Sequence, residues 1–332
     1  MGHDGTCAEI FLYSPARHVQ FCAMNQHITR RLFLSRTALT VAATSTISLS
    51  RAVEPFVRPG KPKLMMSLAG YSFRDFFKEG KGTNPKSDPT KRMDMLQFVD
   101  YCAEQDCAAE VTSYFFPAKV TDDFLLKMKR HAFLRGVALS GTAVGNTFTH
   151  PAGPKRDAEI VSVKEWVDHA AVMGAPHIRV FAGEPQKTSK EEAKKLCIET
   201  LEECCDYAGK KGIVLGIENH GGIIGNAADL LEIMRAVKSP WCGVNLDSGN
   251  FRTDDPYQDF ALCAPYAVNV QWKAEITPRG GQKQPADLKR IVKILREANY
   301  QGYVALEYEA GEDPWAAVPR LLKEMREIIN AG

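Results

Sequence analysis

Four residues with oxygen-bearing side chains stand where four successive apolar stretches of this 332-residue chain end. They are Glu218 in IVLGIENHGG, Asp247 in WCGVNLDSGNF, Gln271 in VNVQWKAEIT and Glu307 in GYVALEYEAG, at intervals of 29, 24 and 36 residues. Each interval is about the length of one strand, loop, helix and loop. Carboxylate and amide oxygens are the donors that hard divalent cations prefer. If the four strands are parallel neighbours, their ends predict a metal site.

From Lys63 onward the chain alternates strand-like and helix-like stretches. Strands are predicted at 63–73, 108–116, 137–148, 177–181, 213–218, 242–246, 268–272 and 303–307. Helices are predicted at 91–105, 121–135, 160–174, 189–212, 227–238, 255–264, 287–298 and 315–330. Apolar strands alternating with helices over this length predict a single (β/α)₈ TIM barrel, an α/β fold. A doubly wound open sheet is disfavoured, because the first strand ends in GYSFRDFF without a glycine-rich phosphate loop.

The first 52 residues have the features of an export leader. TRRLFL at 29–34 resembles the twin-arginine motif, and an apolar Ala/Thr/Ser stretch follows it. We therefore predict a leader at 1–52, a linker at 53–62 and the barrel at 63–332, with export to the periplasm. Met24 begins a leader of more usual length and is a candidate for the true start. The alternative is a disordered basic tail on a cytoplasmic protein.

Composition excludes several other classes of protein. The formal net charge is +2, and residues 1–52 hold five Arg against Asp4 and Glu9, so the rest of the chain is close to neutral and a nucleic-acid-binding surface is not expected. No run of 18 apolar residues is present, which argues against a membrane span. Nine cysteines without a CxxC pair argue against a disulfide or zinc framework.

The strand-end motifs resemble the xylose isomerase-like TIM barrels, which include sugar-phosphate isomerases and epimerases. The resemblance runs from about residue 63 to 329 and is carried by ENH at 218–220, NLDSGN at 245–250, VQWKAE at 270–275 and YVALEYE at 303–309. It implies that Glu218, Asp247, Gln271 and Glu307 bind one divalent metal. An all-oxygen donor set favours Mg²⁺ or Mn²⁺. Epimerases often have His in place of Gln271, whereas hydroxypyruvate isomerase-like members resemble this chain in having Gln. Family members are often dimers or tetramers, so a homo-oligomer is expected.

Such a metal site predicts proton transfer at a carbon next to a carbonyl. The substrate would pass through an enediolate, with Glu218 and Glu307 as the acid/base pair. The predicted function is a metal-dependent isomerase or epimerase of a sugar or hydroxy-carbonyl compound, with a sugar or keto-acid as substrate. The alternative is a lyase or dehydratase acting on a keto-sugar or keto-glycoside. A nuclease is disfavoured, because only five His follow the leader.

Five further residues are predicted to bind the substrate. Tyr71 would wall a sugar pocket, Asn250 stands where many epimerases place a substrate-binding His, and Lys273 would stabilise oxyanion charge. His220 would touch substrate or orient a ligand. Arg279 would clamp a carboxylate or phosphate. The plain alternatives are an ion pair between Lys273 and Glu309 or Glu275, and a solvated loop position for Arg279.

Overall fold

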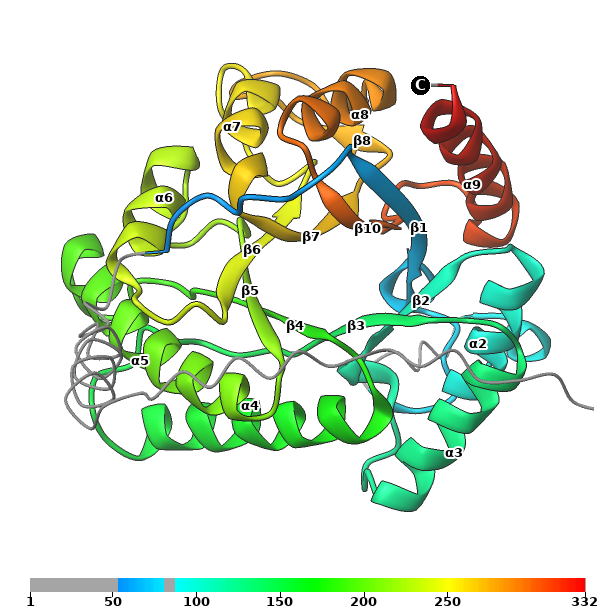
Figure 1. Cartoon of the computed structure of the whole chain (residues 1–332), viewed down its shortest axis with the longest axis horizontal. Helices are drawn as coiled ribbons and strands as arrows, with labels where there is room; N and C mark the ends of the chain where they lie inside the picture. The colour runs from blue at the N-terminus through cyan, green and yellow to red at the C-terminus, as the bar shows by residue number, and fades with distance from the viewer. Residues whose placement is uncertain (1–52, 81–86, 332) are drawn as a thin grey trace, which may run out of the picture. The chain divides into compact units, whose positions relative to one another are not determined.

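Within residues 53–80 and 87–331, which the computed structural model describes, the chain forms a closed (β/α)₈ barrel (Figure 1). Neighbouring strands are parallel and follow the order β1-β10-β7-β6-β5-β4-β3-β2. The predicted fold is therefore confirmed. The strands are β1 (Lys63–Ala69), β2 (Ala108–Thr112), β3 (Leu139–Ala143), β4 (His177–Val180), β5 (Val214–Glu218), β6 (Cys242–Asp247), β7 (Ala267–Trp272) and β10 (Gln301–Leu306).

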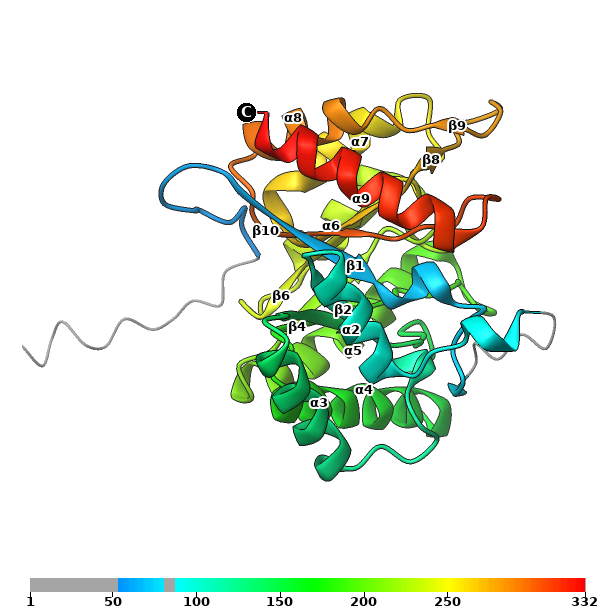
Figure 2. The ribbon, with the colours of Figure 1, turned by 90° about the vertical axis from the view of Figure 1, so that its right-hand side faces the viewer.

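Helices range around the outside of the strands, as Figures 1 and 2 show. At the start of α5 the Ser189 side chain accepts a hydrogen bond from the Glu192 amide, as the capping spacing predicts. Helix α4 begins earlier than predicted, because Pro154 occupies its first turn with a φ already suited to a helix. The α-helices are α2 (Met95–Glu104), α3 (Asp122–Leu134), α4 (Pro154–Met173), α5 (Lys190–Lys210), α6 (Ala227–Ala236), α7 (Pro256–Cys263), α8 (Leu288–Glu297) and α9 (Pro314–Asn330).

Three predicted strands end earlier than expected, among them β3, which stops at Ala143 instead of 148. After β1 the chain turns into the 3₁₀ helix η1 (Gly70–Phe73), and after β2 into η4 (Ser113–Phe115). Both turns are rich in aromatic residues, which also favour strands, so composition alone misplaces the boundary. A short antiparallel hairpin, β8 (Glu275–Ile276) with β9 (Gln284–Pro285), lies in the loop after β7 and was not predicted.

The inside of the barrel is polar, whereas the layer between strands and helices is apolar. Ser67 and Ser140 meet inside with their hydroxyl oxygens 2.7 Å apart. The His177 ring lies 2.9 Å from the Ser140 carbonyl oxygen, at the amino-terminal end of the barrel as predicted. Burial lowers the pKa of His177 to about 4, so this ring is neutral and structural at physiological pH. Because TIM-barrel active sites lie at the carboxyl ends of the strands, the functional polar groups are expected at the opposite end of this barrel.

Residues 53–62, predicted as a linker, pack against the amino-terminal end of the barrel. The Val53 amide donates to the Val237 carbonyl at 2.9 Å, and Asn299 donates to the Arg58 carbonyl at 2.7 Å. The predicted leader at 1–52, with its twin arginines and Met24, lies outside the described residues. Across 53–80 and 87–331, no helix has the length and apolar character needed to cross a bilayer.

Candidate active site

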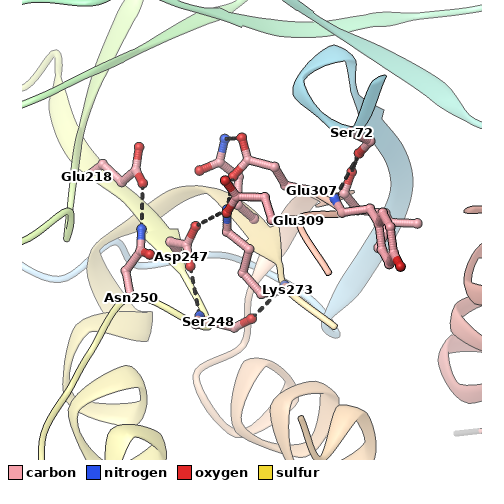
Figure 3. Close-up of polar contacts among 12 residues, drawn as sticks. Ser72, Glu218, Asp247, Ser248, Asn250, Lys273, Glu307 and Glu309 are labelled. Carbon is pink, nitrogen blue, oxygen red and sulfur yellow. Dashed lines mark hydrogen bonds and ion pairs between the residues drawn. The ribbon is translucent and has the colours of Figure 1, made fainter. Parts of the chain in front are cut away.

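The four strand-end residues all lie at the carboxyl-terminal mouth of the barrel. Glu218 ends β5, Asp247 ends β6, Gln271 stands one residue before the end of β7, and Glu307 follows β10 directly. Each is at most 5% exposed. Figure 3 shows Asp247 between Glu218 on one side and Glu307 on the other. The sequence pattern therefore located a buried polar cluster, which covers four neighbouring strands.

Glu218 is held from both sides by neighbouring side chains. One carboxylate oxygen lies 3.0 Å from the Arg179 guanidinium on β4, and the other accepts from the Asn250 amide at 2.8 Å. The guanidinium also stacks over the Phe181 ring at 3.9 Å. Burial raises the pKa of Glu218, although the charge of Arg179 opposes this shift. Burial alone would lower the pKa of Arg179, but the nearby charge of Glu218 raises it above its ordinary value. The two side chains thus form a buried ion pair, which the sequence analysis missed.

Lys273 occupies the space between the other carboxylates. Its ammonium lies 2.6 Å from Glu307 and 3.4 Å from Asp247, and it also pairs with Glu309 (Figure 3). Burial raises the pKa of Asp247 to about 7, although Lys273 opposes the shift. One oxygen of Asp247 accepts from the Gly249 amide at 2.8 Å, and the other is buried without a hydrogen-bond donor. This second oxygen is the one that lies 3.4 Å from the Lys273 ammonium, so it can bind a cation only when Lys273 moves away.

Gln271 belongs to a closed ring of hydrogen bonds inside the barrel. Its amide nitrogen and that of Asn269 donate to the two oxygens of Glu110, at 3.0 and 2.8 Å. Asn245 completes the ring by donating to the Gln271 oxygen and accepting from Asn269, each at 2.8 Å. Each Glu110 oxygen accepts from an amide nitrogen, so Glu110 fixes which way the Gln271 amide faces. That amide nitrogen also lies 3.4 Å from Glu307.

Glu110, fully buried on β2, was not among the predicted site residues. Its only signal in the sequence is a single acidic residue within the apolar strand AAEVT. Burial and the charge of Glu307 raise its pKa to about 7, above the ordinary value of 4.5. The folded protein therefore keeps this proton up to about pH 7, whereas the unfolded chain loses it near pH 4.5.

Glu110→Gln is expected to remove this pH dependence of stability. Between pH 4.5 and 7 the folded wild type binds more protons than the unfolded chain, so this group lowers its free energy of unfolding as pH rises. At about 1.4 kcal/mol per pH unit, the variant should gain ~3 kcal/mol on the wild type across that range. Urea unfolding in EDTA at several pH values measures the difference. Glu104→Gln, at an exposed position of α2, is the matched control, and parallel curves for Glu110→Gln and wild type would contradict the prediction.

Small polar side chains lock the strand ends that carry the cluster. Asn219 donates to the Asp247 carbonyl at 2.9 Å and accepts from the Asp247 amide at 2.8 Å, which ties β5 to β6 past their last ladder bonds. The Ser248 hydroxyl accepts from the Lys273 amide at 2.9 Å. Ser72 donates to the Leu306 carbonyl at 3.0 Å and accepts from the Tyr308 amide at 2.9 Å. The carboxylates are therefore carried on fixed backbone.

Of the five predicted substrate-binding residues, the structure brings Asn250 and Lys273 into the cluster. His220 is exposed at the rim, with its ring 4.4 Å from that of Phe181. Tyr71 lies close enough to Glu309 for that charge to add to burial in raising its pKa. Arg279 is 62% exposed and pairs with Asp254 at 3.6 Å, so it points to the neighbouring loop. Beside the cluster lies a pocket of about 230 Å³, lined by Asn250, Lys273, Glu309, Arg252, Lys283 and backbone of their loops.

The charges of the cluster do not balance. Five carboxyl groups (Glu110, Glu218, Asp247, Glu307 and Glu309) face two buried cations, Arg179 and Lys273, and burial lets protons offset part of the excess by raising the pKa of Glu110, Glu218 and Asp247. Uncompensated buried charge is costly, so such a site takes up protons or a cation. In the described residues no three His, Cys, Asp or Glu are arranged around one ready-made ion position. Excess charge, hard oxygen donors and the donor-free Asp247 oxygen nevertheless fit a divalent cation.

A closed parallel barrel with its polar cluster at the carboxyl ends of the strands defines a TIM barrel. Residues 102–325 match the family model described as xylose isomerase-like TIM barrel, so the chain belongs to that family. The predicted resemblance is thereby confirmed. No curated protein matches the chain by sequence.

Solved structures with this fold include known sugar epimerases. The 3-keto-D-glucoside 4-epimerase YcjR from E. coli has a TM-score of 0.59 and 17% identity, covering 80% of this chain and 99% of its own. D-Psicose 3-epimerase from Clostridium cellulolyticum H10 has a TM-score of 0.60 and 15% identity, covering 80% and 91%. The IOLI protein, solved with a zinc atom, has a TM-score of 0.61 and 16% identity, covering 80% and 96%. At these identities the likeness concerns the fold.

Proposed function

We propose that the protein is a divalent-metal-dependent isomerase or epimerase of a sugar or related hydroxy-carbonyl compound. The observation that carries the proposal is the cluster of Glu218, Asp247, Gln271 and Glu307 at the barrel mouth, with its excess of negative charge. Family membership supports it, as does the occurrence of this fold in the 3-keto-D-glucoside and D-psicose epimerases. TIM-barrel enzymes keep their active sites at this end.

Three carboxylates of the cluster, with the amide oxygen of Gln271, would hold the cation. Asp247 offers an oxygen that accepts no hydrogen bond. The Gln271 oxygen accepts from Asn245 while its amide nitrogen faces Glu110 and Glu307, so this amide would have to turn to present its oxygen to the cation. An all-oxygen set favours Mg²⁺ or Mn²⁺ over Zn²⁺. When bound, the cation would supply a Lewis acid for the carbonyl and hydroxyl oxygens of the substrate.

Glu307 is the better placed of the two proposed acid/base groups to take a proton from carbon. One of its oxygens contacts Lys273 at 2.6 Å, whereas the other has only the 3.4 Å contact with the Gln271 amide. Both oxygens of Glu218 are engaged at 3.0 Å or less. In this proposal Glu307 removes one proton from carbon and becomes neutral, and Glu218 in its protonated form delivers its own proton from the other side and becomes ionised, once the Asn250 amide has turned to the substrate.

Metal content tests the proposal directly. Wild type saturated with Mg²⁺ or Mn²⁺ and then desalted is expected to retain close to one ion per chain by elemental mass spectrometry. Glu218→Gln/Glu307→Gln should lose it, because two of the proposed ligands lose their charge. Arg290→Met, at an exposed position of α8, serves as a surface control that keeps the ion.

The reaction is tested on a panel of keto-sugars and keto-glycosides followed by proton NMR in D₂O. Deuterium incorporation next to the carbonyl together with stereo- or positional isomers would support the isomerase. An unsaturated product would instead identify a lyase using the same site. A protein that retains no ion and exchanges no proton would overturn the proposal.

A further inference from the structure

The Lys273 ammonium is surrounded by three carboxylates and has little room to move elsewhere. It contacts Asp247, Glu307 and Glu309, and its side chain is 9% exposed. A Cβ placed on Gly249 would lie 2.7 Å from Lys273 Cγ, so the stem lies flat against the Gly249 backbone. Lys273 is thus confined between these three carboxylates.

The three partners of Lys273 differ in burial and in place. Asp247 and Glu307 have side chains that are 0% and 7% exposed, and both belong to the proposed ligand set. Glu309 is 38% exposed and lies two residues after Glu307, past the end of β10. The ammonium therefore bridges an inner pair of carboxylates and one outer carboxylate, as Figure 3 shows.

A divalent cation on the inner pair cannot share its oxygens with an ammonium. The two positive charges would lie within a few ångströms of each other, where like charges repel strongly in a buried site. Binding a metal therefore requires Lys273 to leave Asp247 and Glu307. Glu309 is already in contact with it and offers a place to which the ammonium can withdraw while staying paired.

We propose that Lys273 is the internal counter-cation of the metal site, neutralising Asp247 and Glu307 before metal binds and withdrawing onto Glu309 when it does. This inference rests on the proposed function, because it takes the cluster as a metal site. Lys273 is a positioning residue in this role: it sets the affinity for the ion and keeps the metal-free cluster from repelling itself. Glu309 has a distinct part as the carboxylate that receives the displaced ammonium.

The experiment measures Mn²⁺ binding to metal-stripped full-length protein by isothermal titration calorimetry. Lys273→Met is expected to bind Mn²⁺ at least about tenfold more tightly than wild type, a change of ~1.4 kcal/mol. Lys273→Arg keeps the charge and should not tighten binding. Glu309→Gln should weaken binding severalfold, because the ammonium then stays on the inner carboxylates. In Lys273→Met/Glu309→Gln the effect of Glu309 should vanish, since no ammonium remains to be received.

The outcomes separate this inference from the proposed function. If wild type binds Mn²⁺ and Lys273→Met binds it equally or less tightly, the counter-cation role is overturned and the metal site stands. Equal effects of Glu309→Gln with and without Lys273 would overturn the withdrawal onto Glu309. If neither wild type nor Lys273→Met binds millimolar Mn²⁺, the metal site itself fails, and the counter-cation role fails with it.

Discussion

Glu307→Gln is expected to slow proton exchange next to the substrate carbonyl by about 10²–10⁴-fold, the usual contribution of a general base. The substitution keeps the size of the side chain and one acceptor oxygen that can face Lys273, but an amide cannot take a proton at neutral pH. The measurement is deuterium incorporation from D₂O, followed by proton NMR on the keto-sugar that wild type turns over. The pocket beside Lys273 and Asn250 is unchanged in this variant, but one proposed metal ligand loses its charge, so exchange is compared at saturating Mn²⁺.

Glu312→Gln is the matched control for this variant. Glu312 lies on the same loop between β10 and α9, but its carboxylate pairs with Arg320 and its side chain is 49% exposed. The Glu312→Gln variant should exchange the substrate proton at the wild-type rate. Urea unfolding of both variants shows whether the fold is kept. A Glu307→Gln protein that folds normally and exchanges at more than a tenth of the wild-type rate would remove Glu307 from the role of base.

The barrel could be predicted because each of its helices and strands is indicated by a short stretch of sequence. Each helix has an apolar stripe and each strand is an apolar run, so the order of elements follows from short stretches of sequence. Caps such as Ser189 and the left-handed Gly174 mark helix ends within a residue or two. The ends of two strands were misplaced because residues 70–73 and 113–115 are aromatic, which favours a strand, but form 3₁₀ turns.

The sequence predicted those site residues that directly close an apolar strand. A polar residue that closes an apolar strand is conspicuous, and Glu218, Asp247, Gln271 and Glu307 all have this signature. Arg179 and Glu110 lie inside strands, and each belongs to the site only through contacts with residues on another strand. Glu110 bonds to Asn269 and Gln271, 159 and 161 residues along the chain. Such pairs reach across the inside of the barrel between β2 and β7, which are not neighbouring strands, and no local pattern specifies them.

Arg179→Met is expected to lower the free energy of unfolding of the metal-free protein by about 3–5 kcal/mol. Methionine fills similar space but leaves Glu218 as a buried carboxylate without the cation that contacts it. The Arg179 and Glu218 side chains are 4% and 3% exposed, so water cannot replace the lost partner. Urea unfolding in EDTA at pH 7.5 measures the loss. The exposed Arg290, which pairs with Asp255 at 3.0 Å, is the matched control, and its Met variant should cost less than about 1 kcal/mol.

The double variant Arg179→Met/Glu218→Gln distinguishes the effect of the ion pair on stability from the effect of the packing contacts of either side chain. Removing both charges leaves no uncompensated ion, so the double variant should be more stable than Arg179→Met. If the two are equally unstable, the loss comes from the contacts of Arg179 with Phe181 and the Val144 carbonyl. In that case Arg179 shapes the wall of the mouth and does not hold Glu218. A recovery would instead mean that Arg179 keeps Glu218 charged and oriented, which a carboxylate must be in order to serve as ligand or base.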